Sequence, residues 1–242
     1  MKFAAYCGTH NIYGDMETSA KSLIANSDVD IVFFVIEDDK FPSELPSIVR
    51  CVNVSNQPWF KPDGPNMDSQ FTYMAMMRIA LCHVLPDCDK VLSLDCDTIV
   101  MKDVSDIWDL PIDDCYFSAA TEWHRTANGL QYCNFGVVLY NLGKMRDGKA
   151  DECIEVMNRR KYPWVEQDVG NYLCQGRIHD MPNELNSCWF TDQDAPDPAI
   201  KHFAGKSRHE WVNRAEVMEW RNMSWDEVMR RHGEDTHCGA NI

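Results

Sequence analysis

The sequence lacks an apolar run long enough to cross a membrane. Its longest run, Ile31 to Ile36, is bounded by Asp30 and Glu37, whereas a membrane-spanning helix needs about 20 predominantly apolar residues. The N-terminal stretch also lacks the extended apolar segment of a secretory signal peptide. We therefore expect no transmembrane segment, while peripheral contact with a membrane surface stays open.

Positive charge is also scarce. The chain of 242 residues carries 23 Lys and Arg against 38 Asp and Glu, so its formal net charge is −15. Proteins that bind nucleic acids gain affinity by neutralising phosphates with clustered basic side chains, and this sequence has no such cluster. We therefore do not expect a nucleic acid as a partner.

The sequence contains no C-x-x-C pair and no internal repeat, although cysteines are numerous. There are 11 of them, an odd number, spread from Cys7 to Cys238. This is not the pattern of a small secreted domain stabilised by disulfides. Reduced thiols that pack as small apolar groups are the better interpretation, and they predict a cytoplasmic protein.

Apolar runs alternate with segments of helical composition along most of the chain. The pattern predicts strands at 2–7, 31–36, 90–100, 115–120, 134–142 and 177–181, and helices at 15–25, 70–85 and 150–160. Such alternation is typical of an α/β protein with a mostly parallel central sheet flanked by helices. Two capping-box spacings, Asn213 with Glu216 and Ser224 with Glu227, predict a C-terminal tail of two short helices packed on the domain.

Two carboxylates stand towards the C-terminal end of the predicted strand 90–100. Asp95 and Asp97 flank Cys96, in the region where open parallel sheets bind ligands. Neighbouring carboxylates repel each other, so both stay ionised only if a cation or strong donors compensate. Oxygen ligands suit Mg²⁺ or Mn²⁺, which would in turn hold substrate phosphates.

The same segment allows an alternative interpretation. LSLDCDTIV (92–100) also resembles the first motif of haloacid-dehalogenase-type phosphohydrolases, in which Asp95 would be the nucleophile.

Four segments carry a second and more extensive resemblance. They are YMAMMRIALCHVLPDCDKVLSLDCDTIV (73–100), NFGVVLYNL (134–142), VEQDVGNYL (165–173) and IKHFAGKSR (200–208). In this order and spacing they resemble family 8 of the retaining glycosyltransferases, which includes glycogenin and lipopolysaccharide galactosyl- and glucosyltransferases. The resemblance implies a GT-A fold over 1–208, with a nucleotide-binding half at about 1–100, an acceptor half at about 101–208 and a helical extension at 209–242.

The resemblance also implies a reaction and a metal. A hexose, glucose or galactose, would pass from a UDP-sugar to a glycan or another hydroxyl acceptor, with Mn²⁺ or alternatively Mg²⁺ as the cofactor. Asp95 and Asp97 match the metal-binding Asp-x-Asp of the family, and His202 matches its third protein ligand. Two carboxylates and one imidazole leave coordination positions on Mn²⁺ for diphosphate oxygens.

Further residues match the donor-binding positions of the family. Gly205 would let the backbone approach the diphosphate because it has no Cβ, and Arg208 stands where the family usually has Lys. Arg78, a charged residue in an apolar segment, would face the donor sugar and diphosphate. Asn134 and Glu122 would line the sugar hydroxyls, with Glu122 at a position where the family usually has Asp.

The turn after the first strand is expected to hold the uracil. Tyr6, Thr9, His10 and Tyr13 fall in this region, and of these Tyr13 is the predicted stacking partner.

Glu166, Gln167 and Asp168 stand where the family has Asp-Gln-Asp. An amide is a poor nucleophile, so we expect front-face transfer in which the carbonyl dipole of Gln167 stabilises an oxocarbenium-like transition state. Double displacement through Glu166 or Asp168 is the alternative mechanism. The departures at Glu122, Glu166 and Arg208 leave open a non-catalytic module that binds a UDP-sugar or a glycan.

Overall fold

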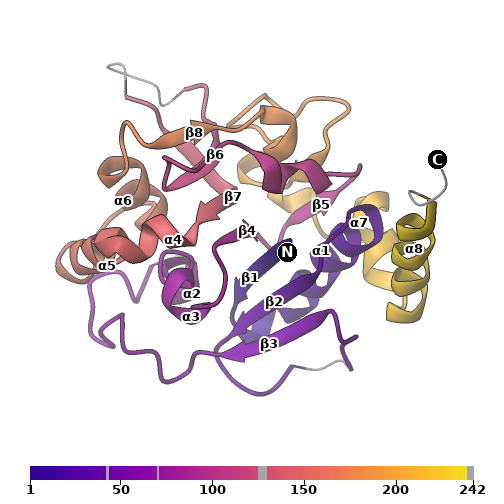
Figure 1. Ribbon diagram of the computed structural model, residues 1–242, viewed down its shortest axis with the longest axis horizontal. Coiled ribbons are helices and arrows are strands. Elements are labelled where there is room, and N and C mark those ends of the chain that lie inside the picture. The colour runs from indigo at the N-terminus through magenta and orange to yellow at the C-terminus, as the bar shows by residue number, and fades with distance from the viewer. Residues whose placement is uncertain (42–43, 70, 125–129, 239–242) are drawn as a thin grey trace.

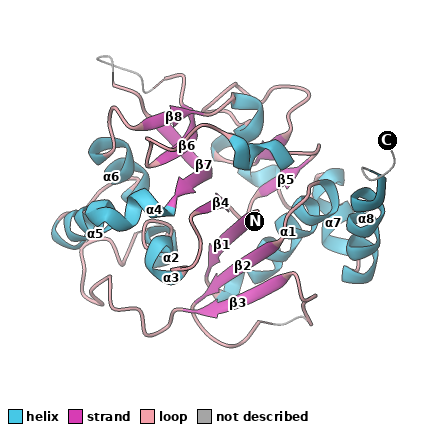
Figure 2. Ribbon diagram, in the orientation of Figure 1, coloured by secondary structure: helices cyan, strands magenta, loops and turns pink. Residues whose placement is uncertain are grey.

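The computed structural model describes residues 1–41, 44–69, 71–124 and 130–238 as an α/β protein around a seven-stranded sheet (Figures 1 and 2). The strand order is β3-β2-β1-β4-β7-β6-β8. All neighbours in this order are parallel except the two pairs that β7 makes with β4 and β6. The prediction of a mostly parallel sheet flanked by helices is therefore confirmed. The strands are β1 (Phe3–Gly8), β2 (Ile31–Ile36), β3 (Val49–Asn53), β4 (Lys90–Leu94), β6 (Phe117–Thr121), β7 (Cys133–Asn141) and β8 (Ile178–Asp180).

A second sheet has two strands, β5 (Thr98–Val100) and β9 (Ile200–His202), which pair antiparallel. This sheet brings the segment that follows Asp95 and Asp97 next to the segment that begins the sequence HFAG (202–205), about 100 residues later in the chain. The helices are α1 (Tyr13–Asn26), α2 (Thr72–Met76), α3 (Leu81–Val84), α4 (Leu142–Lys144), α5 (Ala150–Arg159), α6 (Val165–Leu173), α7 (Ala215–Asn222) and α8 (Trp225–Cys238). No helix in the described ranges is both long and apolar enough to span a membrane.

Helices cover both faces of the seven-stranded sheet. Every residue of β2 is buried, and because side chains alternate along a strand, successive residues enter different cores. Val32 and Phe34 pack in a core with α1, α7 and α8, whereas Phe33 and Val35 pack in a core with α2, α3, α5 and α6. This double coverage explains why β2 reads as a continuous apolar run.

Two predicted elements are interrupted in the structure. The predicted helix 70–85 divides into α2 and α3, with its first residue, Gln70, outside the described residues. Between them the amides of Arg78 and Ile79 donate to carbonyl oxygens three residues back, at 3.2 and 3.1 Å, a tighter pattern than that of an α-helix. The predicted strand 90–100 divides into β4 and β5, and the Thr98 hydroxyl closes the turn between them by donating to the Asp95 carbonyl at 2.8 Å.

The C-terminal helices α7 and α8 pack against α1, burying Val217, Trp220 and Val228. The Ser224 side chain accepts a hydrogen bond from the Glu227 amide at 3.3 Å, as a capping residue does. The capping box predicted at Asn213 is wrong, because α7 begins one residue later, with an N-cap at 214 that makes no side-chain capping bond.

One carboxylate on α1 connects α7 to the segment that carries Arg208. Asp15 accepts hydrogen bonds from Trp211 Nε1 at 2.8 Å and from Arg221 Nη2 at 3.2 Å. The Arg208 guanidinium lies 4.0 Å from the same carboxylate. Asp15 therefore joins α1, α7 and the 3₁₀ helix Gly205–Glu210.

Candidate active site

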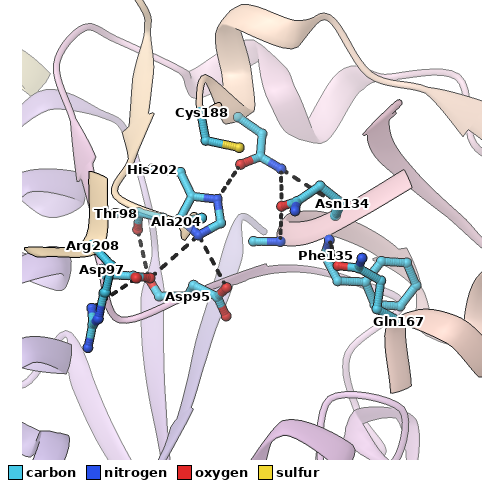
Figure 3. A network of polar contacts seen from close by, with 12 residues as sticks. Asp95, Asp97, Thr98, Asn134, Phe135, Gln167, Cys188, His202, Ala204 and Arg208 are labelled. Atoms are coloured by element: carbon cyan, nitrogen blue, oxygen red, sulfur yellow. Dashed lines mark hydrogen bonds and ion pairs between the residues drawn. The ribbon is translucent and has the colours of Figure 1, made fainter. Parts of the chain in front are cut away.

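Asp95, Asp97 and His202 converge at the carboxyl end of β4 and β9 (Figure 3). His202 Nε2 lies 3.4 Å from Asp95 Oδ2 and 3.5 Å from Asp97 Oδ1. Backbone bonds fix both acidic residues: the Asp95 amide donates to the Gly136 carbonyl at 2.7 Å, and the Asp97 carbonyl accepts from the Phe203 amide at 2.9 Å. One ligand atom from each of the three residues lies within 4.8 Å of the others, close enough for one cation to bind all three.

Asn186 determines which nitrogen of His202 faces the carboxylates. The amide oxygen of Asn186 accepts a hydrogen bond from His202 Nδ1 at 2.9 Å, and its amide nitrogen donates to Asn134 Oδ1 at 3.0 Å. Because an amide oxygen only accepts, Nδ1 carries a proton. This leaves Nε2 as the nitrogen available to a metal, while the other ring nitrogen is held by a hydrogen bond, as in most metal-binding histidines.

Gly136 makes room for the imidazole ring. A Cβ at this position would lie 2.1 Å from Cε1 and 2.2 Å from Nδ1 of His202, well inside the normal contact distance of about 3.5 Å. The close approach of β7 to His202 therefore requires glycine here.

Each aspartate uses its second oxygen to bind an arginine. Asp95 Oδ1 lies 2.7 Å from Arg78 Nη2, and Asp97 Oδ2 lies 2.9 Å from Arg208 Nη1. Arg78 also lies 3.2 Å from the Glu166 carboxylate and donates to the Phe135 carbonyl. The carboxylates of Asp95, Asp97 and Glu166 carry three negative charges, and the two arginines carry two positive ones. The cluster therefore has a net charge of −1 when the imidazole is neutral.

These contacts shift the protonation of the buried groups. Burial alone would raise the pKa of Asp97, but the His202 ring and the Arg208 charge lower it to about 2. Burial would lower the pKa of His202, but its hydrogen bonds to the two aspartates raise it well above the ordinary value. For Glu166 burial dominates and raises the pKa, with Arg78 opposing the shift.

Gln167 lies at the centre of a second polar network. Its amide oxygen accepts from the Phe135 amide at 2.9 Å, and its amide nitrogen donates to Glu122 Oε1 at 3.2 Å. Asn134 Nδ2 donates to the same oxygen of Glu122 at 3.0 Å. The network fixes the orientation of Gln167 at the start of α6.

A cavity of about 550 Å³ contains both networks. Its lining includes the two aspartates, His202, Arg78, Glu122, Asn134, Glu166, Gln167, Gly205, Arg208 and Thr9. Gly205 has φ +60, and a Cβ there would lie 2.6 Å from Phe190. The structure thus places most of the predicted donor-site residues around one space large enough for a small-molecule ligand.

Four predicted residues lie elsewhere. Tyr6 and Tyr13 are buried in the core and do not line the cavity. Tyr6 belongs to β1 and accepts a hydrogen bond from Ser19, while Tyr13 stacks on Phe41. The prediction that Tyr13 stacks on uracil is therefore corrected.

Asp168 also points away from the cavity. Its carboxylate accepts from the Tyr132 hydroxyl at 2.6 Å and from the Trp164 amide at 2.9 Å. His10 likewise lies outside the lining and pairs with Glu37 at 2.9 Å.

Other lining residues were not predicted from the sequence. They include Cys7 near the end of β1, Asn11 and Ile12 in the turn that follows, and the aromatic residues Phe71, Trp164 and Phe190 around the rim. A strand end, helix start positions and loops carry them, and no motif marks them. Asn186, which orients His202, was missed for the same reason.

Comparisons with known proteins agree with this geometry. The model of Glycosyl transferase family 8 matches residues 4–208. A putative glycosyltransferase of Haemophilus influenzae is 24% identical over 202 residues, covering 74% of this chain and 60% of that protein. Glycosyltransferase GlyA of Streptococcus pneumoniae serotype 4 is 26% identical over 200 residues, covering 77% of this chain and 27% of that protein. The chain therefore spans less than two thirds of either relative.

Solved structures share the fold. Glycosyltransferase GlyE of Streptococcus pneumoniae TIGR4 has a TM-score of 0.70 at 18% identity, covering 97% of this chain and 64% of that one. Galactosyltransferase LgtC, solved with donor and acceptor sugar analogs, has a TM-score of 0.67 at 18% identity, covering 96% of this chain and 100% of that one. The family match sets aside the phosphohydrolase alternative with Asp95 as nucleophile. The chain belongs to glycosyl transferase family 8 and has the GT-A fold.

Proposed function

We propose that this protein is a metal-dependent retaining glycosyltransferase that moves a hexose, glucose or galactose, from a UDP-sugar to a glycan or another hydroxyl acceptor. The observation that carries the proposal is the convergence of Asp95, Asp97 and His202 on one point inside a large cavity. The cytoplasmic location expected from the cysteine pattern stays a prediction.

The two carboxylate oxygens and the imidazole nitrogen fit a divalent cation such as Mn²⁺ or Mg²⁺ as ligand atoms. Asp95 Oδ2, Asp97 Oδ1 and His202 Nε2 face one another, while the remaining carboxylate oxygens bind arginines. A cation would replace the proton that the carboxylates favour on Nε2. It would turn the local net charge from 0, with the imidazole protonated, to +1, which favours a diphosphate. When bound, the metal supplies Lewis-acid neutralisation of the charge on the departing UDP.

The chain's own residues would bind the rest of the donor. Arg208 can donate two parallel hydrogen bonds to phosphate oxygens, and Gly205 brings the backbone close to them. Thr9 at the turn after β1, with its neighbour Asn11, would contact the nucleoside. Asn134 and Glu122 would hold the sugar hydroxyls.

Front-face transfer is the mechanism that this arrangement favours. The Gln167 oxygen accepts one hydrogen bond from Phe135 and keeps a second lone pair for the developing positive charge on the sugar. Glu166 is paired with Arg78 and Asp168 lies outside the cavity, so neither is a free nucleophile for double displacement. The acceptor hydroxyl would attack from the leaving-group side and lose its proton to the UDP phosphate.

A donor-hydrolysis screen tests the proposal. UDP release is measured with UDP-glucose, UDP-galactose, UDP-N-acetylglucosamine and UDP-xylose in the presence of Mn²⁺. The wild type should hydrolyse at least one hexose donor, and Asp97→Ala should lower the rate by about 100-fold or more, because loss of even an outer partner of a metal ligand costs about 10- to 100-fold.

Asp63→Ala, at an exposed position outside the cavity lining, is the matched control and should keep the wild-type rate. Full activity of Asp97→Ala would refute the metal assignment. Binding of UDP and Mn²⁺ without hydrolysis or transfer of any donor would instead identify a non-catalytic sugar-nucleotide module.

A further inference from the structure

A second cavity, of about 450 Å³, lies on the other side of the first turns of α6. It is lined by Asp168, Asn171 and Tyr172 of α6 and by Gln175, two residues beyond the end of that helix. They follow one another at intervals of three, one and three, so they form a stripe along one face of the helix and its C-terminal end. Tyr132 and Tyr162 complete the wall together with Arg160.

The lining of this second cavity combines aromatic faces with free polar groups. Three tyrosines contribute rings, and Tyr172 is 73% exposed. Within the described ranges, the hydroxyls of Tyr162 and Tyr172 make no hydrogen bond, and Arg160 has no carboxylate partner: its guanidinium lies over the Tyr162 ring at 5.6 Å. Such a wall offers flat apolar surfaces beside unsatisfied donors and acceptors.

The charge of the lining favours an uncharged ligand. Arg160 and Asp168 contribute one charge of each sign, and the carboxylate of Asp168 is already bonded to Tyr132 and Trp164. A ligand with apolar faces, many hydroxyls and no net charge matches these groups. Neutral sugar rings have this chemistry, whereas an anionic ligand would find one exposed cation and one nearby anion.

The second cavity adjoins the donor cavity. Gln167 lines the first and Asp168, the next residue, lines the second. The Tyr132 hydroxyl spans the wall between them, accepting from Gln167 Nε2 at 3.2 Å and donating to Asp168 Oδ1 at 2.6 Å. A ligand in the second cavity thus lies one side chain away from the residue proposed to face the reacting sugar.

We propose that the second cavity binds a neutral saccharide, namely the part of the acceptor glycan beyond its attacking sugar. This inference rests on the proposed function, and it identifies the second cavity as the place where the enzyme selects its acceptor. Tyr172 and Tyr162 provide stacking surfaces, and Arg160 donates to sugar hydroxyls.

A printed array of neutral and anionic oligosaccharides tests the inference. The full chain is labelled and applied with UDP and Mn²⁺, and donor hydrolysis without acceptor is measured in parallel. The wild type should bind a subset of neutral glycans. Tyr172→Ala should weaken that binding about tenfold, as removal of an aromatic contact residue commonly does, while donor hydrolysis stays within twofold of the wild type.

Arg160→Gln is a second variant at an exposed position and should weaken the same glycans. Met218→Ala on α7, at a residue that is 36% exposed, is the control and should change nothing. The inference is overturned if no glycan binds, if anionic glycans are preferred, or if Tyr172→Ala leaves binding unchanged. Binding that depends on Tyr172 in a protein without donor hydrolysis would keep the saccharide site and refute the proposed function instead.

Discussion

Gly136→Ala should abolish metal binding while leaving most of the fold in place. The added methyl carbon would lie 2.1 Å from Cε1 of His202, so the ring must move by more than about 1 Å to reach a normal contact distance. Metal-ligand distances tolerate only about 0.2 Å, so the imidazole would no longer coordinate together with Asp95 and Asp97. We expect the affinity for Mn²⁺ to fall by about 100-fold or more.

Titration calorimetry with Mn²⁺ in the presence of UDP measures the affinity, and urea unfolding measures the accompanying loss of stability. Overpacking of this kind costs about 1 to 3 kcal/mol, so the variant should still fold. Gly14→Ala is the matched control, because a Cβ there meets nothing within 4 Å. If Gly136→Ala binds Mn²⁺ as tightly as the wild type, and His202→Ala does so too, the imidazole is not a ligand and the reasoning fails.

Two further predictions concern stability. Arg78→Met should lower the free energy of unfolding by about 3 kcal/mol in urea, because it leaves the buried carboxylate of Glu166 and the partly exposed carboxylate of Asp95 without their cation; a loss below about 1 kcal/mol would contradict the pairing. Glu216 accepts from Lys201 at 2.9 Å, and although burial would raise its pKa, its bonds to the backbone and to Lys201 lower it below the ordinary 4.5. The stabilisation is therefore present above pH 4.5 and lost as the pH falls, so Glu216→Gln should cost about 0.5 kcal/mol at pH 7 and nothing in acid. A cost that is the same at both pH values would argue against this ion pair.

The sheet and the convergence of Asp95, Asp97 and His202 could be predicted from the sequence because short local segments carry the signal for each. β2 is an uninterrupted apolar run, and the Asp-x-Asp and HFAG segments occur in a characteristic order. The break at Arg78 could not be predicted, since the apolar composition of 70–85 continues through it. That turn depends on partners in other parts of the chain: Phe135, Asp95 and Glu166.

For Asp168 and Tyr6, the sequence itself indicates that the side chain points away from the cavity. Residues two apart in an α-helix point in nearly opposite directions, so Glu166 and Asp168 could not both face one ligand directly. Tyr6 alternates with Ala5 and Cys7 along β1, and it is Cys7 that lines the cavity while Tyr6 enters the opposite core. Asn186, in contrast, ends the short 3₁₀ helix Asn183–Asn186 and acts through a hydrogen bond that no sequence pattern marks.

Asp15 has a consequence for how relatives of this chain can diverge. Its carboxylate binds Trp211 and Arg221 and lies near Arg208, so the C-terminal helix α7 and the rim of the cavity share one anchor. A descendant that exchanges this helix for a different module must either supply new donors to this carboxylate or lose the acid as well. We therefore expect residue 15 to change together with the tail, while Asp95, Asp97 and His202 stay as they are.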